Sequence, residues 1–194
     1  FVKRIIVCGS GAEYDKRVPL VHVKEEEFGA RIPADEYGFS KYIMSSVAER
    51  SDNIVVLRFF GVFGKYEDYE FKFISNSIVK NLLRMPITIR QNVFFDYLYI
   101  DDCVRIIEWF VKAKRMPKHH SYNLVTGSRV DLVTLAKKIN EHSDFKSQIN
   151  VVNNGLNNEY SADNSRLLTE IGHFRFTPLD ESIPALIGYY RSII

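Results

Sequence analysis

The sequence contains little of several features that would define its class. It has two cysteines and one tryptophan among 194 residues. Cys8 and Cys103 stand in apolar surroundings, so we expect reduced core thiols rather than a disulfide or a metal pair. The net charge is +2, which is too small to indicate a nucleic-acid or membrane partner. No apolar run reaches membrane-spanning length, and we expect no signal peptide and a cytoplasmic protein.

A complete glycine-rich fingerprint is also missing. Residues 3–8 form an apolar, β-branched run that predicts a buried strand, and Gly9, Ser10 and Gly11 follow it. A dinucleotide-binding turn would need its third glycine at position 14, which is Tyr14. We therefore expect Ser10 to lie at the carboxyl end of a parallel strand, where α/β sheets build their sites. The alternative is a turn residue that bonds its own backbone.

Tyr37 and Lys41 are the first pair of residues that point to chemistry. Residues four apart on a helix lie on the same face, one turn from each other. A free phenol has a pKa of about 10, and a nearby ammonium lowers that pKa by stabilising the phenolate. Such a pair can shuttle a proton to or from a substrate hydroxyl. The alternative is an ordinary exposed Tyr and Lys at the start of a helix.

The pattern along the chain predicts an alternation of helices and strands. A helix over residues 37–50 and a buried strand over 54–60 would complete a parallel βαβ unit with the first strand, whereas residues 19–36 are expected to form a polar loop. Asp101 and Asp131 are expected to cap helices. The remaining predicted elements are helices at 71–83, 165–171 and 179–192, strands at 87–89 and 148–152, and a polar loop at 153–158.

Five stretches resemble, in order, the motifs of one family. They are IIVCGSGAEY at 5–14, YGFSK at 37–41, LRFFGVFG at 57–64, DYLYIDD at 96–102 and YNLVTG at 122–127. The chain resembles the C-terminal portion of an extended short-chain dehydrogenase/reductase, in the NAD-dependent sugar epimerase/dehydratase family. The glycine-rich N-terminal half of that family has no counterpart here. The chain also begins with Phe rather than Met, and we expect a fragment of a longer polypeptide.

The resemblance implies an α/β fold. It would combine the remnant of a doubly wound parallel, Rossmann-like sheet with a smaller, mixed α/β substrate-binding domain. Residues 1–64 would be the C-terminal part of the dinucleotide-binding sheet, carrying the catalytic Ser and the YxxxK helix. Residues 65–194 would form mainly the substrate-binding domain.

The resemblance also implies a reaction, namely epimerisation or dehydration of a (nucleotide-)sugar through a keto intermediate. Tyr37 would be the base, Lys41 would lower its pKa, and Ser10 would bond the substrate oxygen as it becomes a carbonyl. Tyr37, Lys41 and Phe60 would contact NAD or NADP. The enzyme would be an isomerase or an oxidoreductase, and the sequence does not choose between them. A homodimer through the Tyr37 and Phe71 helices is a further expectation.

Some expected features of the substrate site are altered. Gly61 and Phe95 stand where relatives commonly have Asn and Arg, and these two residues together with Arg90 are our candidates for substrate binding. An arginine fork holds phosphate bidentately, which neither Gly nor Phe can do. The cations that could compensate are Arg90, Lys65, Lys72 and Arg166. No metal site is expected, because the adjacent histidines at 119 and 120 have no further ligand nearby.

Only 36 residues precede Tyr37, and one βαβ unit alone takes about 30. We therefore expect the chain on its own to bind NAD or NADP weakly and to be inactive. Two other functions stay open: an NAD(P)-dependent carbonyl reductase, and a non-catalytic binding module that kept the fold. The set of Ser10, Tyr37 and Lys41 argues against the module, as does the near-neutral charge.

Overall fold

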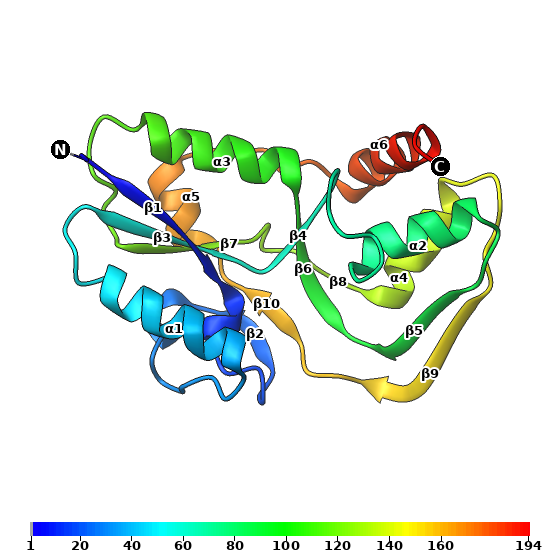
Figure 1. The fold of residues 1–194 in the computed structure, drawn as a ribbon, viewed down its shortest axis with the longest axis horizontal. Coiled ribbons are helices and arrows are strands. Elements are labelled where there is room, and N and C mark those ends of the chain that lie inside the picture. Colours follow the sequence, from blue (N-terminus) through cyan, green and yellow to red (C-terminus); the bar gives the residue numbers. More distant parts are fainter. Residues whose placement is uncertain (1) are drawn as a thin grey trace.

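A computed structural model describes residues 2–194, and its first lobe is built on a parallel sheet with the strand order β1-β3-β7 (Figure 1). The strands are β1 (Ile5–Ser10), β3 (Ile54–Phe59) and β7 (Ser121–Leu124). The register runs from Ile5 opposite Ile54 to Ser10 opposite Phe59. The carboxyl ends of the strands therefore meet at one edge, and the predicted βαβ unit is confirmed.

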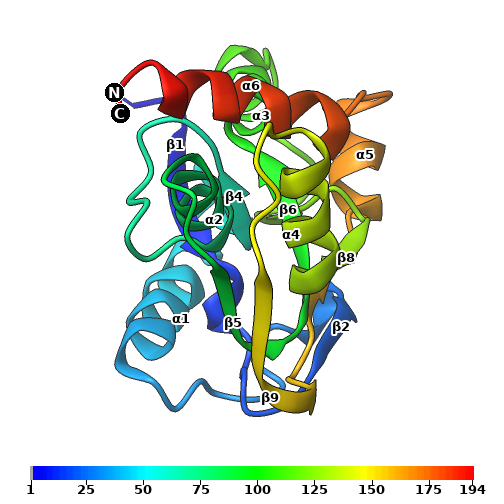
Figure 2. The same cartoon turned by 90° about the vertical axis from the view of Figure 1, so that its right-hand side faces the viewer.

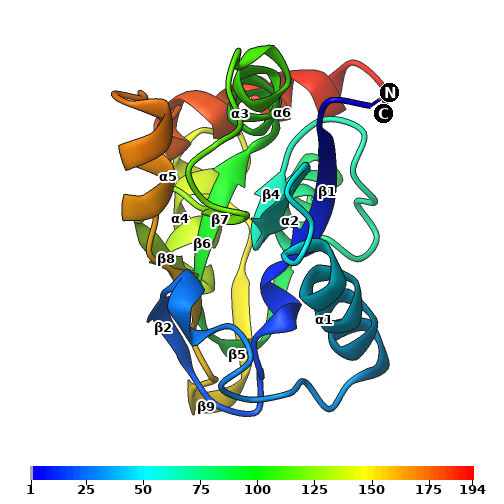
Figure 3. The ribbon, with the colours of Figure 1, turned by 90° about the vertical axis from the view of Figure 1, so that its left-hand side faces the viewer.

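Helices α1 (Glu36–Ala48) and α3 (Ile100–Lys112) lie on opposite faces of this sheet, as Figure 3 shows. Apolar residues of α3 such as Ile106 and Phe110 are fully buried against Val55 and Leu57 of β3. Helix α5 (Ser165–Ile171) packs beside β7. Strand β1 is the edge of this sheet and has β3 as its one neighbour within residues 2–194.

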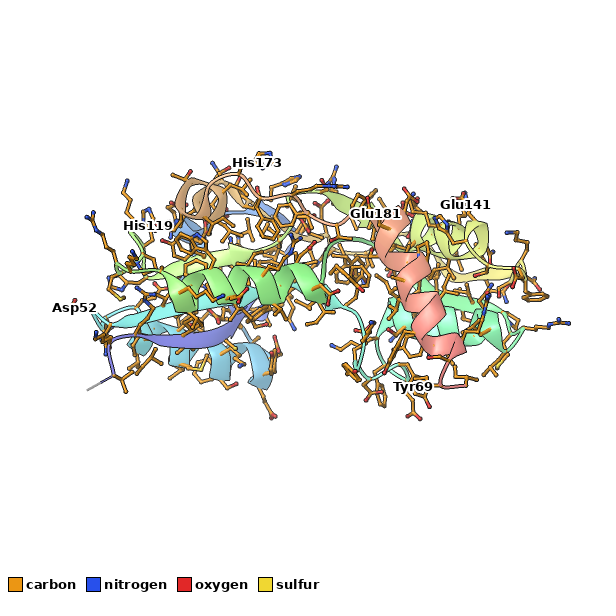
Figure 4. The ribbon with its side chains drawn as sticks, turned by 90° about the horizontal axis from the view of Figure 1, so that it is seen from above. Asp52, Tyr69, His119, Glu141, His173 and Glu181 are labelled. Carbon is orange, nitrogen blue, oxygen red and sulfur yellow. The ribbon has the colours of Figure 1, made fainter. Side chains whose placement is uncertain are left out.

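The second lobe is built from three helices and one pair of strands (Figure 2). These are α2 (Phe73–Leu82), α4 (Leu132–Glu141), α6 (Leu179–Arg191), β5 (Ile87–Asn92) and β9 (Ile149–Leu156). Their apolar faces share one core that includes Ile78, Leu135 and Leu186. Viewed from above, Glu141 and Glu181 lie in this lobe and His119 lies at the far end of the other (Figure 4).

A second sheet joins the lobes. Its strands are β2 (Leu20–Val23), β10 (Tyr160–Ala162), β6 (Phe94–Tyr99), β4 (Gly61–Phe63) and, antiparallel to β6, β8 (Arg129–Asp131). A small core of Tyr14, Leu20, Val23 and Ala162 lies beside it. This core holds the segment after β1 against a strand that lies about 150 residues later in the sequence.

The structure corrects two loop predictions. Residues 19–36 contain β2 and the short 3-10 turn η2 (Glu25–Glu27), and β9 continues to Leu156, where a loop was predicted from 153. Both strands are stabilised by partners distant in the sequence, since β2 pairs with β10 and β9 pairs with β5. Local polarity could not reveal those pairings.

The structure tests the predicted roles of four side chains. Tyr99 is the N-cap of α3, so Asp101 lies inside the first turn and does not cap the helix. Asp131 does cap α4, because its carboxylate accepts hydrogen bonds from the backbone of Val133 and Thr134 at 3.1 Å. Cys103 is a buried free thiol as predicted, whereas Cys8 is exposed because β1 is an edge strand.

The division at residue 64 stays a prediction, and one apolar core contains residues from both sides of it. None of the helices in residues 2–194 has the length and apolar character needed to cross a bilayer. Within the same residues, no group of three His, Cys, Asp or Glu side chains is placed to hold a metal ion.

Candidate active site

Ser10 ends β1 and begins the next turn, η1 (Gly11–Glu13). Its hydroxyl oxygen accepts a hydrogen bond from the Ala12 N–H at 3.1 Å, and its own N–H donates to Glu13 Oε1 at 2.8 Å. Ser10 is 7% exposed. This reciprocal capping fixes the side chain at the carboxyl end of the parallel sheet, where the sequence predicted it.

A buried ion pair lies directly beneath this turn. Arg58 of β3 donates from Nε to Glu13 Oε2 at 2.6 Å, and both side chains are fully buried. Arg58 also pairs with Glu49, and its Cζ lies 4.1 Å from the centre of the Phe28 ring. Because Glu13 binds the Ser10 backbone with one oxygen and Arg58 with the other, the ion pair fixes the height of the Ser10 turn above the sheet.

Tyr37 and Lys41 lie one turn apart on α1, as their spacing predicts. The Lys41 Nζ is 5.9 Å from the centre of the Tyr37 ring and donates to the Cys8 carbonyl at 2.9 Å. That bond holds the lysine side chain against the C-terminal end of β1. Tyr37 is 56% exposed, so its phenol is accessible from solvent.

Gly38 allows the helix to approach the Ser10 turn closely. A Cβ at position 38 would lie 2.5 Å from the Ala12 carbonyl oxygen, a separation that real Cβ atoms do not show. Asp35 caps the helix by accepting from the Gly38 N–H at 2.9 Å, and this bond holds the pKa of Asp35 below its ordinary value. The glycine of the YGFSK motif therefore has a physical reason: it brings Tyr37 beside the segment that carries Ser10.

Ser10 and Tyr37 line one cleft of about 570 Å³, whereas Lys41 is outside its lining. Phe60, which directly follows β3, also lines it. Phe95 of β6 and Tyr160 of β10 belong to the same lining, and the remaining lining residues are Ala12, Lys16, Lys72, Val93, Asn157, Asn158 and Glu159. A neighbouring hollow of about 390 Å³ shares Phe60, Lys72, Val93 and Phe95 with it, so the two are adjacent.

The candidate binding residues are divided by this geometry. Phe60 and Phe95 line both hollows, and Gly61 lines the second one. A Cβ at Gly61 would lie 2.7 Å from the carbonyl oxygen of Asp96, so the strand β4 can pack against β6 only with glycine there. Arg90 lies exposed on β5 and is in the lining of neither hollow. Its role in substrate binding stays a prediction.

Among the four cations that could replace the phosphate-binding Arg, Lys72 lines the cleft. Arg166 is paired with two glutamates of η2, and Lys65 lies against a tyrosine ring of α6. Lys16, which was not predicted as a site residue, also lines the cleft and lies 3.4 Å from Asp35. The positive charge of the cleft is therefore carried by lysines.

Tyr160 is a further residue of the cleft that was not predicted from the sequence. Its ring lies 4.9 Å from the Phe60 ring and 5.7 Å from the Phe95 ring, measured between centres. One signal in the sequence was available: Gly11 directly follows Ser10, and a glycine there indicates a close approach by another group. Which residue makes that approach could not be read from the sequence.

Comparison with known proteins assigns the fold just described. Residues 1–124 match the NAD dependent epimerase/dehydratase family. The chain belongs to this family. No curated protein sequence matches the chain significantly.

Solved structures of other family members share the fold. The similar structures include a UDP-glucose 4-epimerase from Thermotoga maritima, with a TM-score of 0.82, 21% identity and coverage of 99% of this chain and 64% of that chain. A dTDP-glucose 4,6-dehydratase from Bacillus anthracis has a TM-score of 0.81 and 16% identity, and the match covers 97% of this chain and 62% of that chain. A GDP-mannoheptose C4 reductase from Campylobacter jejuni has a TM-score of 0.80 and 16% identity, and the match covers 98% of this chain and 68% of that chain.

The chain thus spans less than two thirds of the length of the first two of these proteins. At such low identity the likeness shows the fold alone. The predicted family and the predicted α/β, Rossmann-like fold class are both confirmed.

Proposed function

We propose that the chain is the catalytic and substrate-binding part of an NAD-dependent epimerase or dehydratase that acts on a (nucleotide-)sugar through a keto intermediate. The observation that carries this proposal is the convergence of Ser10 and Tyr37 on one cleft, with the Lys41 ammonium 5.9 Å from the Tyr37 ring. The similar structures named above are enzymes of nucleotide sugars, which supports the same class of substrate.

The three side chains would divide the work of proton transfer. Tyr37 is accessible from the cleft and would remove a proton from a sugar hydroxyl. Lys41 would favour the phenolate form of Tyr37, because a nearby positive charge stabilises it. The Ser10 hydroxyl would donate to the same substrate oxygen as that oxygen becomes a carbonyl, and its fixed position would make this donation effective.

The residues present fit the nicotinamide end of NAD or NADP. The Lys41 ammonium has three N–H donors and uses one on the Cys8 carbonyl, so two are left for ribose hydroxyls. Tyr37, Lys41 and Phe60 would hold this end of the dinucleotide. When bound, the cofactor supplies the acceptor and donor of hydride at the sugar carbon.

The chain lacks a glycine-rich turn that would hold the cofactor phosphates, so we expect weak NAD binding and no turnover from these 194 residues alone. A cytoplasmic location and a homodimer stay predictions as well. Helix α1 exposes Ile43 and Val47, whereas Ile74 and Ile78 of α2 are buried in the core of the second lobe. Of the two predicted dimer helices, α1 therefore has the available apolar surface.

The test uses the chain within its natural full-length polypeptide, with NAD and a panel of UDP-, dTDP- and GDP-sugars, followed by NMR of the products. Epimers or dehydrated keto sugars are the expected products. Replacing Tyr37 with Phe should lower kcat by about 10²- to 10⁴-fold, because the phenol is the proposed base. Tyr42→Phe removes a hydroxyl from the same helix at a position outside the cleft lining, and should leave kcat within about twofold.

Full activity in Tyr37→Phe would contradict the proposed mechanism. Net consumption of NADPH with a carbonyl substrate, without a sugar product, would favour the reductase. The absence of turnover with every substrate, in a protein that binds a sugar, would favour the non-catalytic module.

A further inference from the structure

Tyr160 lines the cleft but has no role in the mechanism above. Its backbone lies in β10, opposite Phe95 of β6 and Leu20 of β2. Its ring packs against Phe60 and Phe95. Contacts on both sides of the backbone and on the ring leave the phenol little freedom, so its hydroxyl has a fixed direction.

The Tyr160 hydroxyl is directed at the turn that carries Ser10. A Cβ at Gly11, the residue after Ser10, would lie 2.5 Å from the phenol oxygen and 2.6 Å from the Phe60 ring. Any side chain at position 11 would therefore displace both aromatic groups. Gly11 permits a contact between the end of β1 and the start of β10.

Tyr160 is a hydrogen-bond donor at neutral pH. Burial raises the pKa of Tyr160 well above that of a free phenol, and the neighbouring Ser10 hydroxyl opposes only part of that rise. Tyr37, Glu13 and Asp35 raise the pKa further. Tyr160 therefore keeps its hydrogen where Tyr37 is proposed to lose one.

The hydrogen-bonding capacity of the Ser10 hydroxyl shows what a hydrogen bond from Tyr160 would do. A serine hydroxyl has one hydrogen to donate and two lone pairs that accept. The Ala12 N–H occupies one lone pair. A second donor on the other lone pair would leave the hydroxyl hydrogen of Ser10 to point away from both donors, into the cleft.

We propose that Tyr160 is a positioning residue that donates its phenolic hydrogen to Ser10 Oγ and so aims the Ser10 hydroxyl at the substrate oxygen. This inference rests on the proposed function, because it gives Tyr160 an effect only through a Ser10 that bonds the substrate. No atom is transferred between the two residues.

The decisive experiment is a double-mutant cycle in the full-length enzyme. Tyr160→Phe keeps the aromatic packing and removes the donor, and should lower kcat by about tenfold with little change in KM. Ser10→Ala should lower kcat by about 10²-fold. The double variant should match Ser10→Ala alone, because without the Ser10 hydroxyl the loss of the Tyr160 donor has no further effect.

Tyr14→Phe is the matched control. Tyr14 is also a buried tyrosine that contacts Phe60, but its hydroxyl donates to Asn123 Oδ1 at 2.9 Å and lies outside the cleft lining. Its removal should leave kcat unchanged within about twofold. A thermal melt of each variant separates loss of folding from loss of rate.

A second measurement needs no activity and uses the 194-residue chain itself. In a sample with ¹³Cζ-labelled tyrosine, the signal that disappears in Tyr160→Phe identifies Tyr160. Ser10→Ala should move that signal and leave the Tyr14 signal in place, because only Tyr160 bonds Ser10.

The outcomes separate the two proposals. A tenfold loss from Tyr160→Phe that persists in the Ser10→Ala background would overturn the positioning role, as would no loss in either background or an unmoved NMR signal. If Ser10→Ala keeps full activity while the NMR signal moves, the contact exists, and it is the proposed function of Ser10 that fails together with the role built on it.

Discussion

The two walls of the cleft are built in different ways. The first wall, residues 10–13 and 37–41, is fixed by the buried pair of Glu13 and Arg58 and by the contact between Gly38 and Ala12. The second wall, residues 93–95 and 157–160 with Lys72, combines aromatic rings, amides, Val93, the Glu159 carboxylate and an exposed lysine. Proton transfer tolerates little misplacement, whereas flat rings and flexible ammonium groups can adapt to a ligand.

The two walls differ in how closely their residues match the motifs of the family. The first wall keeps the residues that the resemblance implies for chemistry. The second wall has Phe95 where an Arg is expected, so the planar guanidinium fork is absent, and the cations that line the cleft are the point charges of Lys16 and Lys72. Under the proposed function, the first wall would carry out the reaction and the second wall would select the sugar nucleotide.

The largest expected effect comes from breaking the support of the first wall. Arg58→Ala leaves Glu13 buried without its partner and should lower the free energy of unfolding by about 3–5 kcal/mol. Urea denaturation measures this. Arg175→Ala is the control, because its ion pair with Glu181 is exposed on both sides and should contribute about 0–1 kcal/mol. Equal losses in the two variants would show that the buried pair does not support the wall.

The next effect tests the contact between helix and turn. Gly38→Ala places a methyl group against the Ala12 carbonyl and should cost about 1–3 kcal/mol of stability. It should also lower kcat, because it pushes Tyr37 away from Ser10. Gly188→Ala in α6 meets no atom within 4 Å, and should stabilise the protein by about 0.5–1 kcal/mol. A stabilised Gly38→Ala variant would contradict the close approach.

A smaller effect sharpens the description of the second wall. Lys72→Ala should raise KM for a nucleotide sugar by about tenfold, an effect that should shrink at high salt because the lysine is exposed. Lys80→Ala, on the same helix but outside the cleft lining, is the control. If KM rises in Arg90→Ala instead of Lys72→Ala, the binding surface extends along β5 and the cleft described above is only part of it.

The smallest effect is a pH dependence beneath the second wall. Asp96 of β6 is fully buried, and burial raises its pKa although Thr126 donates to it from N and Oγ1. The folded protein then holds this proton to a higher pH than the unfolded chain does, so the contribution of Asp96 to stability falls as pH rises above about 4. Asp96→Asn lacks that decline. Its stability relative to wild type should therefore rise between pH 4 and 7 in denaturant titrations, and a constant difference would contradict the direction of the shift.

Features that depend on residues close together in the sequence could be predicted, whereas features that depend on distant residues could not. The βαβ unit, the position of Ser10 and the face shared by Tyr37 and Lys41 depend on short stretches of sequence, and all three were predicted. The strand β2, the extension of β9 and the exposure of Cys8 depend on which strands are neighbours. Tyr160 was missed for the same reason, because its contacts with Gly11 and Phe60 join segments about 100 to 150 residues apart.

The contact at Gly38 has a mechanical consequence. The first turn of α1 packs against the Ala12 carbonyl, and Lys41 donates a hydrogen bond to the Cys8 carbonyl. Tyr37 and Ser10 therefore belong to one rigid side of the cleft. Any closing motion around a bound sugar would then come from the opposite side of the cleft, where Lys72 and β6 lead to the helical lobe. Under the proposed function, ligands of different size would be accommodated on that side, and the distance of proton transfer would stay the same from one substrate to the next.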